Sequence, residues 1–285
     1  MLGQMLMRVL ARAEGFSVCG TARPDAPGLN RFAAENGVVA LSRLVREEGP
    51  FDLVINAIGV RSDRIDESDF RSVQRAIVAN ALLPHHLAAV AEEAAVRVIQ
   101  VSTDGVFARD AGACFEDAPC APLDLYGKTK CLGEPRSARV LTVRCSLIGP
   151  DPRGGRGLLE WLRSRPARAE VTGYTDQMWN GVTTLQFGAL CRVLAGVEVF
   201  DAARAEAAVH HVCPNQTVSK LDLLGLLAEA YRPDISVRPG HSPSAANRTL
   251  ATRFATLGAI LGHHKPMRDA ISELAVEETS SIRAD

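Results

Sequence analysis

The stretch that decides the fold reads Ser102-Thr103-Asp104-Gly105-Val106-Phe107 and follows the apolar run Val96–Val101. A short, continuous apolar run of this kind is typical of a strand that is buried on both faces. Its end therefore carries two hydroxyl-bearing residues, Ser102 and Thr103, and we expect a functional site to begin there.

A second stretch, Leu125-Tyr126-Gly127-Lys128-Thr129-Lys130, supplies the partners of that strand end. Tyr126 and Lys130 are four residues apart, so a helix places both side chains on one face. A free tyrosine has a pKa of about 10, and a nearby lysine cation lowers it. The pair, with Thr103, indicates a site where Tyr126 gives a proton to a carbonyl oxygen while hydride reaches its carbon. The alternative is a solvated helix face that also carries an aromatic residue.

The two stretches together resemble the extended short-chain dehydrogenase/reductases. The resemblance rests on Ser-Thr-Asp-x-Val-Phe at 102–107 and on Tyr-Gly-Lys-Thr-Lys-x-x-Gly-Glu at 126–134. Within that family, the chain is most similar to the sugar-nucleotide reductases related to dTDP-4-dehydrorhamnose reductase, and the similarity covers nearly its whole length. It implies Thr103, Tyr126 and Lys130 as the catalytic triad. It also implies NADPH or NADH as the hydride donor and a nucleotide-linked 4-keto sugar as the substrate.

The composition is that of a globular protein without a strong charge. The 285 residues are 47% hydrophobic and 23% charged with a net charge of −1, so no nucleic-acid partner is expected. No uncharged apolar run approaches the roughly 18 residues of a membrane span, and no signal peptide is visible. The seven cysteines are dispersed without a C-x-x-C pair. That pattern favours reduced thiols in a cytoplasm over a disulfide framework, and no metal site is predicted.

Strands and helices alternate through residue 145, which predicts an α/β fold with a doubly wound parallel, Rossmann-like sheet over residues 1–149. The Pro/Gly/Arg-rich stretch Pro150–Gly157 marks the entry to a smaller C-terminal substrate-binding region, residues 150–285, partly interleaved with the first. A long helix over Glu67–Ala95 is divided or kinked at Pro84. The predicted strands are Phe16–Gly20, a short one near Val38–Leu41, Asp52–Gly59, Val96–Val101, Val140–Cys145 and Val209–Cys213.

The start of the chain departs from the family pattern. A dinucleotide-binding fold opens with a strand, a Gly-x-x-Gly-x-x-Gly turn and a helix, whereas here only Gly3 matches, as the last glycine. The missing strand would lie inside the sheet, and the missing turn would supply backbone N–H groups to the pyrophosphate. Either the true start codon lies roughly a dozen residues upstream, or the chain is a fragment that binds dinucleotide poorly. The intact motifs elsewhere favour the upstream start.

The resemblance also implies a set of cofactor contacts. Arg23 follows the second predicted strand, where an arginine accommodates the extra phosphate of NADP, so NADPH is favoured over NADH. A solvated loop arginine is the alternative. The remaining cofactor-binding residues that the resemblance implies are Gly3, Asn56, Ala57, Ile58, Gly59, Asn80, Ser102, Tyr126 and Lys130.

The implied substrate contacts come from three segments. Arg248 resembles the family arginine that meets the diphosphate, and the arginine fork suits phosphate. Gly105 stands where relatives often carry an aromatic residue, so the identity of the sugar is left open. The full set of predicted substrate-binding residues is Asp104, Val106, Phe107, Asp176, Gln177, Asn180 and Arg248.

The sequence thus favours a cytoplasmic NADPH-dependent reductase of a nucleotide-linked keto sugar that feeds polysaccharide synthesis. Two alternatives stay open. The chain could be a non-catalytic subunit that binds a nucleotide sugar or dinucleotide and regulates a partner, which the absent glycine turn favours. The same triad also serves sugar-nucleotide epimerases and dehydratases. The oligomeric state, a homodimer included, is left open.

Overall fold

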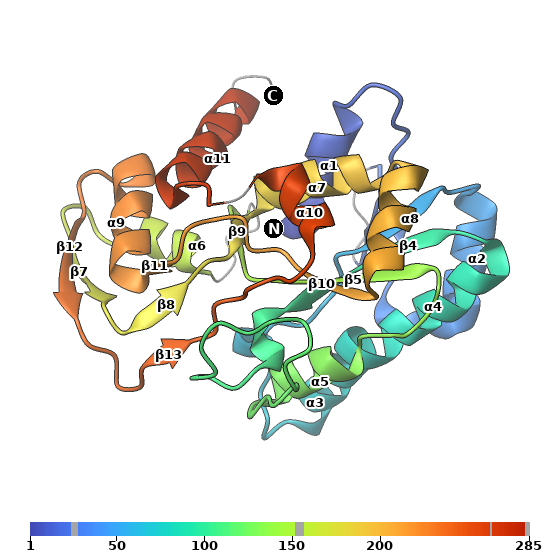
Figure 1. Cartoon of the computed structure of the whole chain (residues 1–285), viewed down its shortest axis with the longest axis horizontal. Helices are drawn as coiled ribbons and strands as arrows, with labels where there is room; N and C mark the ends of the chain where they lie inside the picture. The colour runs from blue at the N-terminus through green and yellow to red at the C-terminus, as the bar shows by residue number, and fades with distance from the viewer. Residues whose placement is uncertain (24–27, 152–156, 263, 283–285) are drawn as a thin grey trace.

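The computed structural model describes residues 1–23, 28–151, 157–262 and 264–282. Its centre is a parallel sheet with the strand order β10-β5-β4-β3 (Figure 1). The strands are β3 (Leu53–Asn56), β4 (Arg97–Thr103), β5 (Val140–Cys145) and β10 (Val209–His211). All residues of β4 and β5 are buried, as expected for central strands covered on both faces.

Helices cover both faces of this sheet, which confirms the predicted doubly wound α/β fold. On one face α1 (Leu2–Ala11), α7 (Thr184–Leu194) and α8 (Val197–Glu206) pack against Ile99 and Leu141. On the other face lie α2 (Gly37–Glu48) and α4 (Leu83–Ala94), whose apolar residues contact Val54 and, through α4, Val98. The alternation of Val98 and Ile99 between the two faces follows from the two-residue repeat of a strand.

Two predictions near the N-terminus are wrong. In place of a strand over Phe16–Gly20, only Thr21–Ala22 (β1) pairs, and its partner is Asn30–Arg31 (β2). A strand needs a neighbour for its backbone groups, and residues 16–20 face a cavity rather than a strand. The predicted strand near Val38–Leu41 belongs to α2. Leu41 and Val45, four residues apart, are the buried residues of that helix.

The long helical region divides near Pro84, as predicted. It consists of α3 (Phe70–Ile77), a π-helical turn, η3 (Val78–Leu82), and α4. Pro84 lies in the first turn of α4, where the missing N–H of proline needs no acceptor. Other connecting elements on this side are η1 (Ala34–Asn36), η2 (Ser62–Arg64), η4 (Asp104–Val106) and α5 (Leu125–Leu132).

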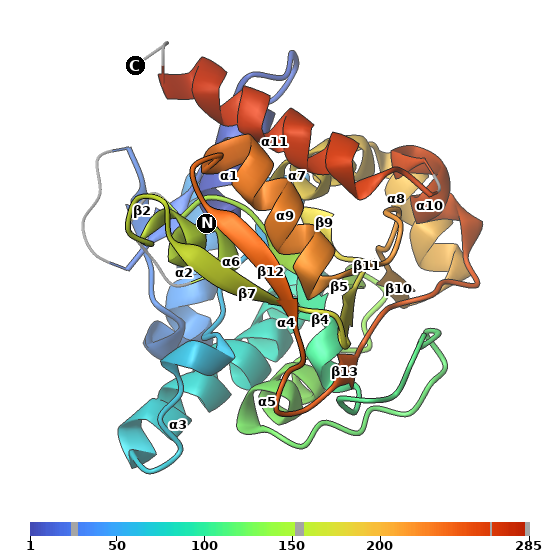
Figure 2. The same ribbon diagram turned by 90° about the vertical axis from the view of Figure 1, so that its left-hand side faces the viewer.

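The C-terminal half builds a second core beside the sheet. Here β7 (Glu170–Tyr174) pairs with β12 (Ser236–Gly240), and α9 (Lys220–Tyr231) lies against both (Figure 2). The chain also returns to the main sheet through β10, α7 and α8. The boundary at residue 150 therefore stays a prediction, and residues 152–156 of the predicted break lie outside the described residues. The other elements are α6 (Leu158–Arg163), β8 (Gln177–Trp179), β11 (Val218–Ser219), β13 (Ala246–Asn247), β6 (Leu147–Ile148), β9 (Val182–Thr183), α10 (Ala255–Leu261) and α11 (Met267–Ile282).

None of the helices in the described part of the chain has the length and apolar character needed to cross a membrane. All seven cysteines are free.

Two glycines let α5 approach the end of β4 and the π-helical turn. A Cβ atom at Gly127 would overlap the carbonyl oxygen of Gly105, and one at Gly133 would overlap the carbonyl oxygen of Asn80. The obstacle in both cases is backbone, which cannot rotate away as a flexible side chain can. Glycine at these two positions therefore fixes how close Tyr126 comes to Thr103.

We expect Gly133→Ala to lower the free energy of unfolding by about 1–3 kcal/mol, because the added methyl group forces the backbone apart. Gly225→Ala is the matched control, since a Cβ at that helical position in α9 meets nothing within 4 Å. It should raise stability by about 0.5–1 kcal/mol through helix propensity. Urea unfolding measures both, and a loss of similar size in the two variants would contradict the close approach.

Candidate active site

A cavity of about 1710 Å³ opens at the carboxyl ends of β3, β4 and β5. The C-terminal half closes its other side with Trp179, Lys220 and Arg248. Ligand pockets are usually about 300–1,000 Å³, so this one has room for more than one ligand. The carboxyl edge of a parallel sheet is also where α/β proteins bind their ligands.

Thr103 and Tyr126 meet in this cavity. Thr103 Oγ1 accepts a hydrogen bond of 3.0 Å from the Gly105 N–H and donates one of 3.0 Å to Asp104 Oδ1. A hydrogen bond with Thr103 also lowers the pKa of Tyr126. The predicted phenol and strand-end hydroxyl are therefore brought together at the wall of the cavity.

The expected lowering of the Tyr126 pKa by Lys130 is wrong for this structure. Burial raises the pKa of Tyr126 to about 12, and the Asp104 carboxylate adds to that rise. The ammonium of Lys130 points instead to β4, where it donates a 2.7 Å hydrogen bond to the carbonyl oxygen of Val101. Removal from water outweighs the Thr103 hydrogen bond and the Arg61 charge, which both lower the pKa, so the phenol holds its proton at neutral pH.

Lys130 is itself buried among polar groups. Burial lowers the pKa of Lys130 to about 8, and the Glu134 carboxylate opposes that shift. Glu134 accepts a hydrogen bond of 2.6 Å from Ser102 Oγ and pairs with the Arg144 guanidinium at 2.7 Å. The Glu134 and Arg144 side chains are only 8% and 6% exposed. Sequence reasoning missed this pair, because residues of α5's end and β5 meet only in the fold.

All of the predicted cofactor-binding residues line the cavity. Two asparagines among them bind the backbone of the turn that follows β3. Asn80 Nδ2 donates to the Val60 carbonyl at 2.8 Å and to Thr129 Oγ1 at 3.1 Å, and its Oδ1 accepts from the Val60 N–H at 2.8 Å. Asn56 Oδ1 accepts from the Ile58 N–H at 3.1 Å. The turn after β3 is thereby tied to α5, which carries Tyr126 and Lys130.

These residues fit a dinucleotide along most of its length. The first turn of α1, which includes Gly3, lines the cavity, and the first N–H groups of a helix have no intrahelical partner. Such a helix start suits a phosphate. The cavity also continues between β3 and residues 16–23, where β3 has no strand partner among the residues described. A phosphate at this end of the cavity would meet the N-terminus of α1.

The predicted substrate residues divide into two groups. Asp104 and Arg248 line the cavity. The other five lie outside its wall in structural contacts: Val106 and Phe107 are buried in a small apolar cluster, Asn180 exchanges two hydrogen bonds with the backbone of Leu250, Asp176 accepts from Ser242, and Gln177 donates to the Ser244 carbonyl. Lys220, Trp179 and Arg61 line the cavity and were missed, because no local motif marks them.

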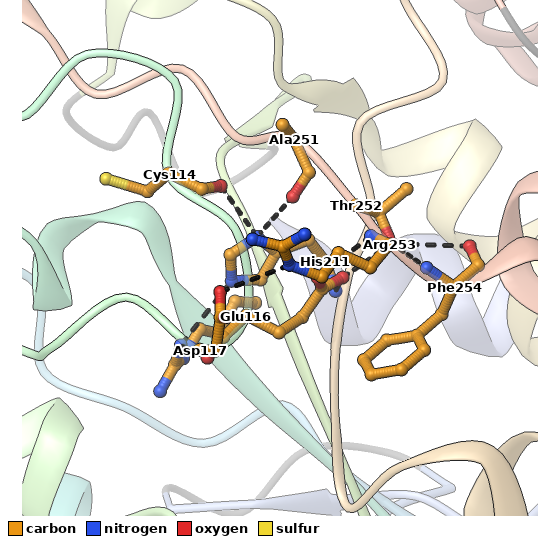
Figure 3. Close-up of polar contacts among 9 residues, drawn as sticks. Cys114, Glu116, Asp117, His211, Ala251, Thr252, Arg253 and Phe254 are labelled. Carbon is orange, nitrogen blue, oxygen red and sulfur yellow. Dashed lines mark hydrogen bonds and ion pairs between the residues drawn. The ribbon is translucent and has the colours of Figure 1, made fainter.

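The segment that carries Arg248 is fixed to the sheet through Glu116. The Glu116 carboxylate accepts hydrogen bonds from the backbone N–H groups of His211 and Arg253, each 3.1 Å long, and from the Thr252 hydroxyl. Figure 3 shows Glu116 between His211 and the 252–253 backbone. Upstream, the Cys114 N–H donates to the Thr249 carbonyl at 3.0 Å. These contacts hold Arg248 at a set distance from β5 and β10.

The parallel sheet with helices on both faces is a Rossmann-like fold, similar to that of the short-chain dehydrogenase/reductases, and Thr103, Tyr126 and Lys130 line its cavity. Comparison with known families identifies the family. The chain belongs to the RmlD substrate binding domain family, whose sequence model matches residues 1–257.

Solved structures share this fold at low sequence identity. The dTDP-4-dehydrorhamnose reductase of Clostridium acetobutylicum has a TM-score of 0.71 and 20% identity over 98% of this chain and 96% of that chain. The enzyme of the same name from Yersinia enterocolitica has a TM-score of 0.72 and 15% identity, over 97% and 95% of the two chains. A Haloferax volcanii protein named as a low-salt glycan biosynthesis reductase is 29% identical over 189 residues. That match spans 62% of this chain and 61% of the relative.

We expect Arg144→Met to lower the free energy of unfolding by about 3–5 kcal/mol, because it leaves the buried Glu134 carboxylate without its cation. Arg43→Met is the matched control. Its partner Glu47 is 4.0 Å away and both side chains are about two-thirds exposed, at 68% and 66%. Its cost should stay below about 0.5 kcal/mol. Equal losses in urea unfolding would show that the Glu134–Arg144 pair is not a buried structural link.

Proposed function

We propose that the protein is an NADPH-dependent reductase of a nucleotide-linked 4-keto sugar. The observation that carries the proposal is the protonated Tyr126 phenol beside Thr103, at the wall of a cavity large enough for two ligands. Membership of the RmlD substrate binding domain family and the likeness to dTDP-4-dehydrorhamnose reductases support it. The seven free thiols support a reducing compartment such as the cytoplasm.

Tyr126 and Thr103 define where the keto oxygen binds. When bound, NADPH would supply a hydride to the keto carbon. The carbonyl π bond breaks as a C–H bond forms, and the oxygen takes the proton of the Tyr126 phenol, which gives an alcohol and a phenolate. Thr103, whose hydrogen bond lowers the pKa of Tyr126, stabilises that phenolate, and Lys130 would bind the nicotinamide ribose of the cofactor. Water then restores the phenol proton.

The residues that would hold the cofactor lie along one side of the cavity. Lys130 would serve the nicotinamide ribose, Ala57–Gly59 in the turn after β3 the adenosine side, and the start of α1 the phosphates. Arg23 also lines the cavity and supports NADPH over NADH. A reductase structure from Bacillus anthracis, with a TM-score of 0.69 and 16% identity over 87% of this chain and 90% of that chain, is a complex with NADP. We assign residues 1–149 mainly to the cofactor and residues 150–285 mainly to the substrate.

A sugar-nucleotide epimerase is the second candidate. The observation that favours it is the likeness to the UDP-glucuronic acid 4-epimerase of Bacillus cereus, with a TM-score of 0.67 and 16% identity over 97% and 96% of the two chains. An epimerase would leave the cofactor unchanged over a full cycle, whereas a reductase consumes one NADPH for each sugar.

Replacement of the proton donor tests the proposal directly. With a dTDP- or UDP-linked 4-keto sugar, the protein should consume NADPH, and Tyr126→Phe should lower kcat by about 10²–10⁴-fold, as expected for loss of a general acid. Affinity for NADP⁺ should stay within about 2-fold of the wild type, since Phe keeps the ring. Absorbance of NADPH and analysis of the sugar product give the readout. Equal kcat values, or a sugar epimerised without NADPH loss, would exclude the proposed reaction.

The pKa of Lys130 predicts how kcat/KM for NADPH depends on pH. Since that pKa is about 8, the cation is present below pH 8 and is lost above it, so kcat/KM for NADPH should fall above about pH 8. The Glu134 carboxylate raises the pKa of Lys130, so Glu134→Gln should move this limb to lower pH in protein that circular dichroism shows to be folded. A limb that stays in place in Glu134→Gln would contradict the assignment to Lys130.

A further inference from the structure

Lys220 occupies an unfavourable place in the chain. It is the first residue of α9 and follows the N-cap Ser219, whose hydroxyl accepts from the Asp222 N–H at 3.1 Å. A cation at a helix start opposes the helix dipole, which favours negative charge there at about 0.3–1 kcal/mol. Residues that cost stability at their position without a structural gain are concentrated at functional sites. The side chain of Lys220 lines the cavity that holds Tyr126.

The surroundings of Lys220 leave its donors available. Its ammonium lies over the Trp179 ring, 5.3 Å from the ring centroid, and the Trp179 indole N–H is held by Ser146 Oγ at 2.8 Å. Burial lowers the pKa of Lys220. Across the described ranges of the chain, no hydrogen bond or ion pair engages the ammonium, which has three N–H donors. A desolvated cation held on an aromatic ring and facing a cavity is suited to bind a ligand oxygen.

Asp104 lines the same cavity, close enough for its charge to interact with that of Lys220. Burial raises the pKa of Asp104, while the charges of Arg248 and Lys220 lower it, so the two cations act on the same carboxylate. Asp104 follows Thr103 directly and shares a hydrogen bond with it. Lys220 therefore acts on the part of the cavity that lies next to the Tyr126 phenol.

We propose that Lys220 binds the sugar ring of the nucleotide sugar, donating to a ring hydroxyl oxygen while Asp104 accepts from a neighbouring hydroxyl. The proposal rests on the proposed function. Hydroxyl groups of a sugar act as donors and acceptors at once, so a nearby carboxylate and ammonium match them. Arg248 is the better diphosphate ligand, since its Nε is buried without a hydrogen-bond partner among the described residues.

The test separates the sugar from the diphosphate. Calorimetry in the presence of NADP⁺ compares dTDP-glucose with dTDP, and UDP-glucose with UDP, in the wild type, in Lys220→Met and in the control Lys128→Met, whose lysine is exposed on α5 and outside the cavity wall. Lys220→Met should weaken binding of the nucleotide sugar by about 10-fold or more, since a hydrogen bond from a charged donor is lost. Its affinity for the nucleoside diphosphate and for NADP⁺ should stay within about 2-fold of the wild type. The control should match the wild type throughout.

Other outcomes overturn the inference in distinct ways. A parallel loss of affinity for the diphosphate and the nucleotide sugar would assign Lys220 to the phosphates. Unchanged affinity for both would make Lys220 a structural partner of Asp104. If Lys220→Met also loses NADP⁺ affinity, Lys220→Arg replaces it as the test variant. Because it keeps the charge, its affinity for the nucleotide sugar should be closer to that of the wild type. A wild-type protein that binds neither nucleotide sugar would instead overturn the proposed function.

Discussion

The anchoring of α5 to the end of β4 is the constraint on which the site depends. The Lys130 ammonium bonds to the carbonyl oxygen of Val101, and glycines at 127 and 133 let the helix backbone approach Gly105 and Asn80. This contact sets the position of Tyr126 relative to Thr103. The Asn80 amide extends the same contact to the turn after β3, so a single side chain links two walls of the cavity.

Burial has an electrostatic consequence for these residues. In a site largely removed from water, charged forms are disfavoured, so the pKa values of Tyr126 and Asp104 rise and those of Lys130 and Lys220 fall. The Glu134 carboxylate, which is paired with Arg144, raises the pKa of Lys130 and opposes the effect of burial. Burial thus keeps the proton on the phenol at neutral pH, which is the state that a general acid needs.

Sequence patterns predicted the sheet and the helix that carries the site, because each of these elements depends on residues that are close together in the sequence. The apolar runs at 96–101 and 140–145 and the four-residue spacing of Tyr126 and Lys130 are of that kind. The predictions failed where the structure depends on contacts between residues far apart in the sequence. Residues 16–20, for example, lack a strand to pair with among the residues described. Lys220, Trp179 and Glu116 gave no local signal, since their partners come from other parts of the chain.

The account depends most directly on the protonation state of Tyr126 in the folded, cofactor-free protein. Carbon-13 NMR of protein labelled at tyrosine Cζ can follow that state, with the resonance assigned by its absence in Tyr126→Phe. Since the pKa of Tyr126 is about 12, its resonance should stay at the phenol position up to about pH 10.5. A midpoint at or below about pH 10 would show that the phenol is not buried as described and would contradict the central claim.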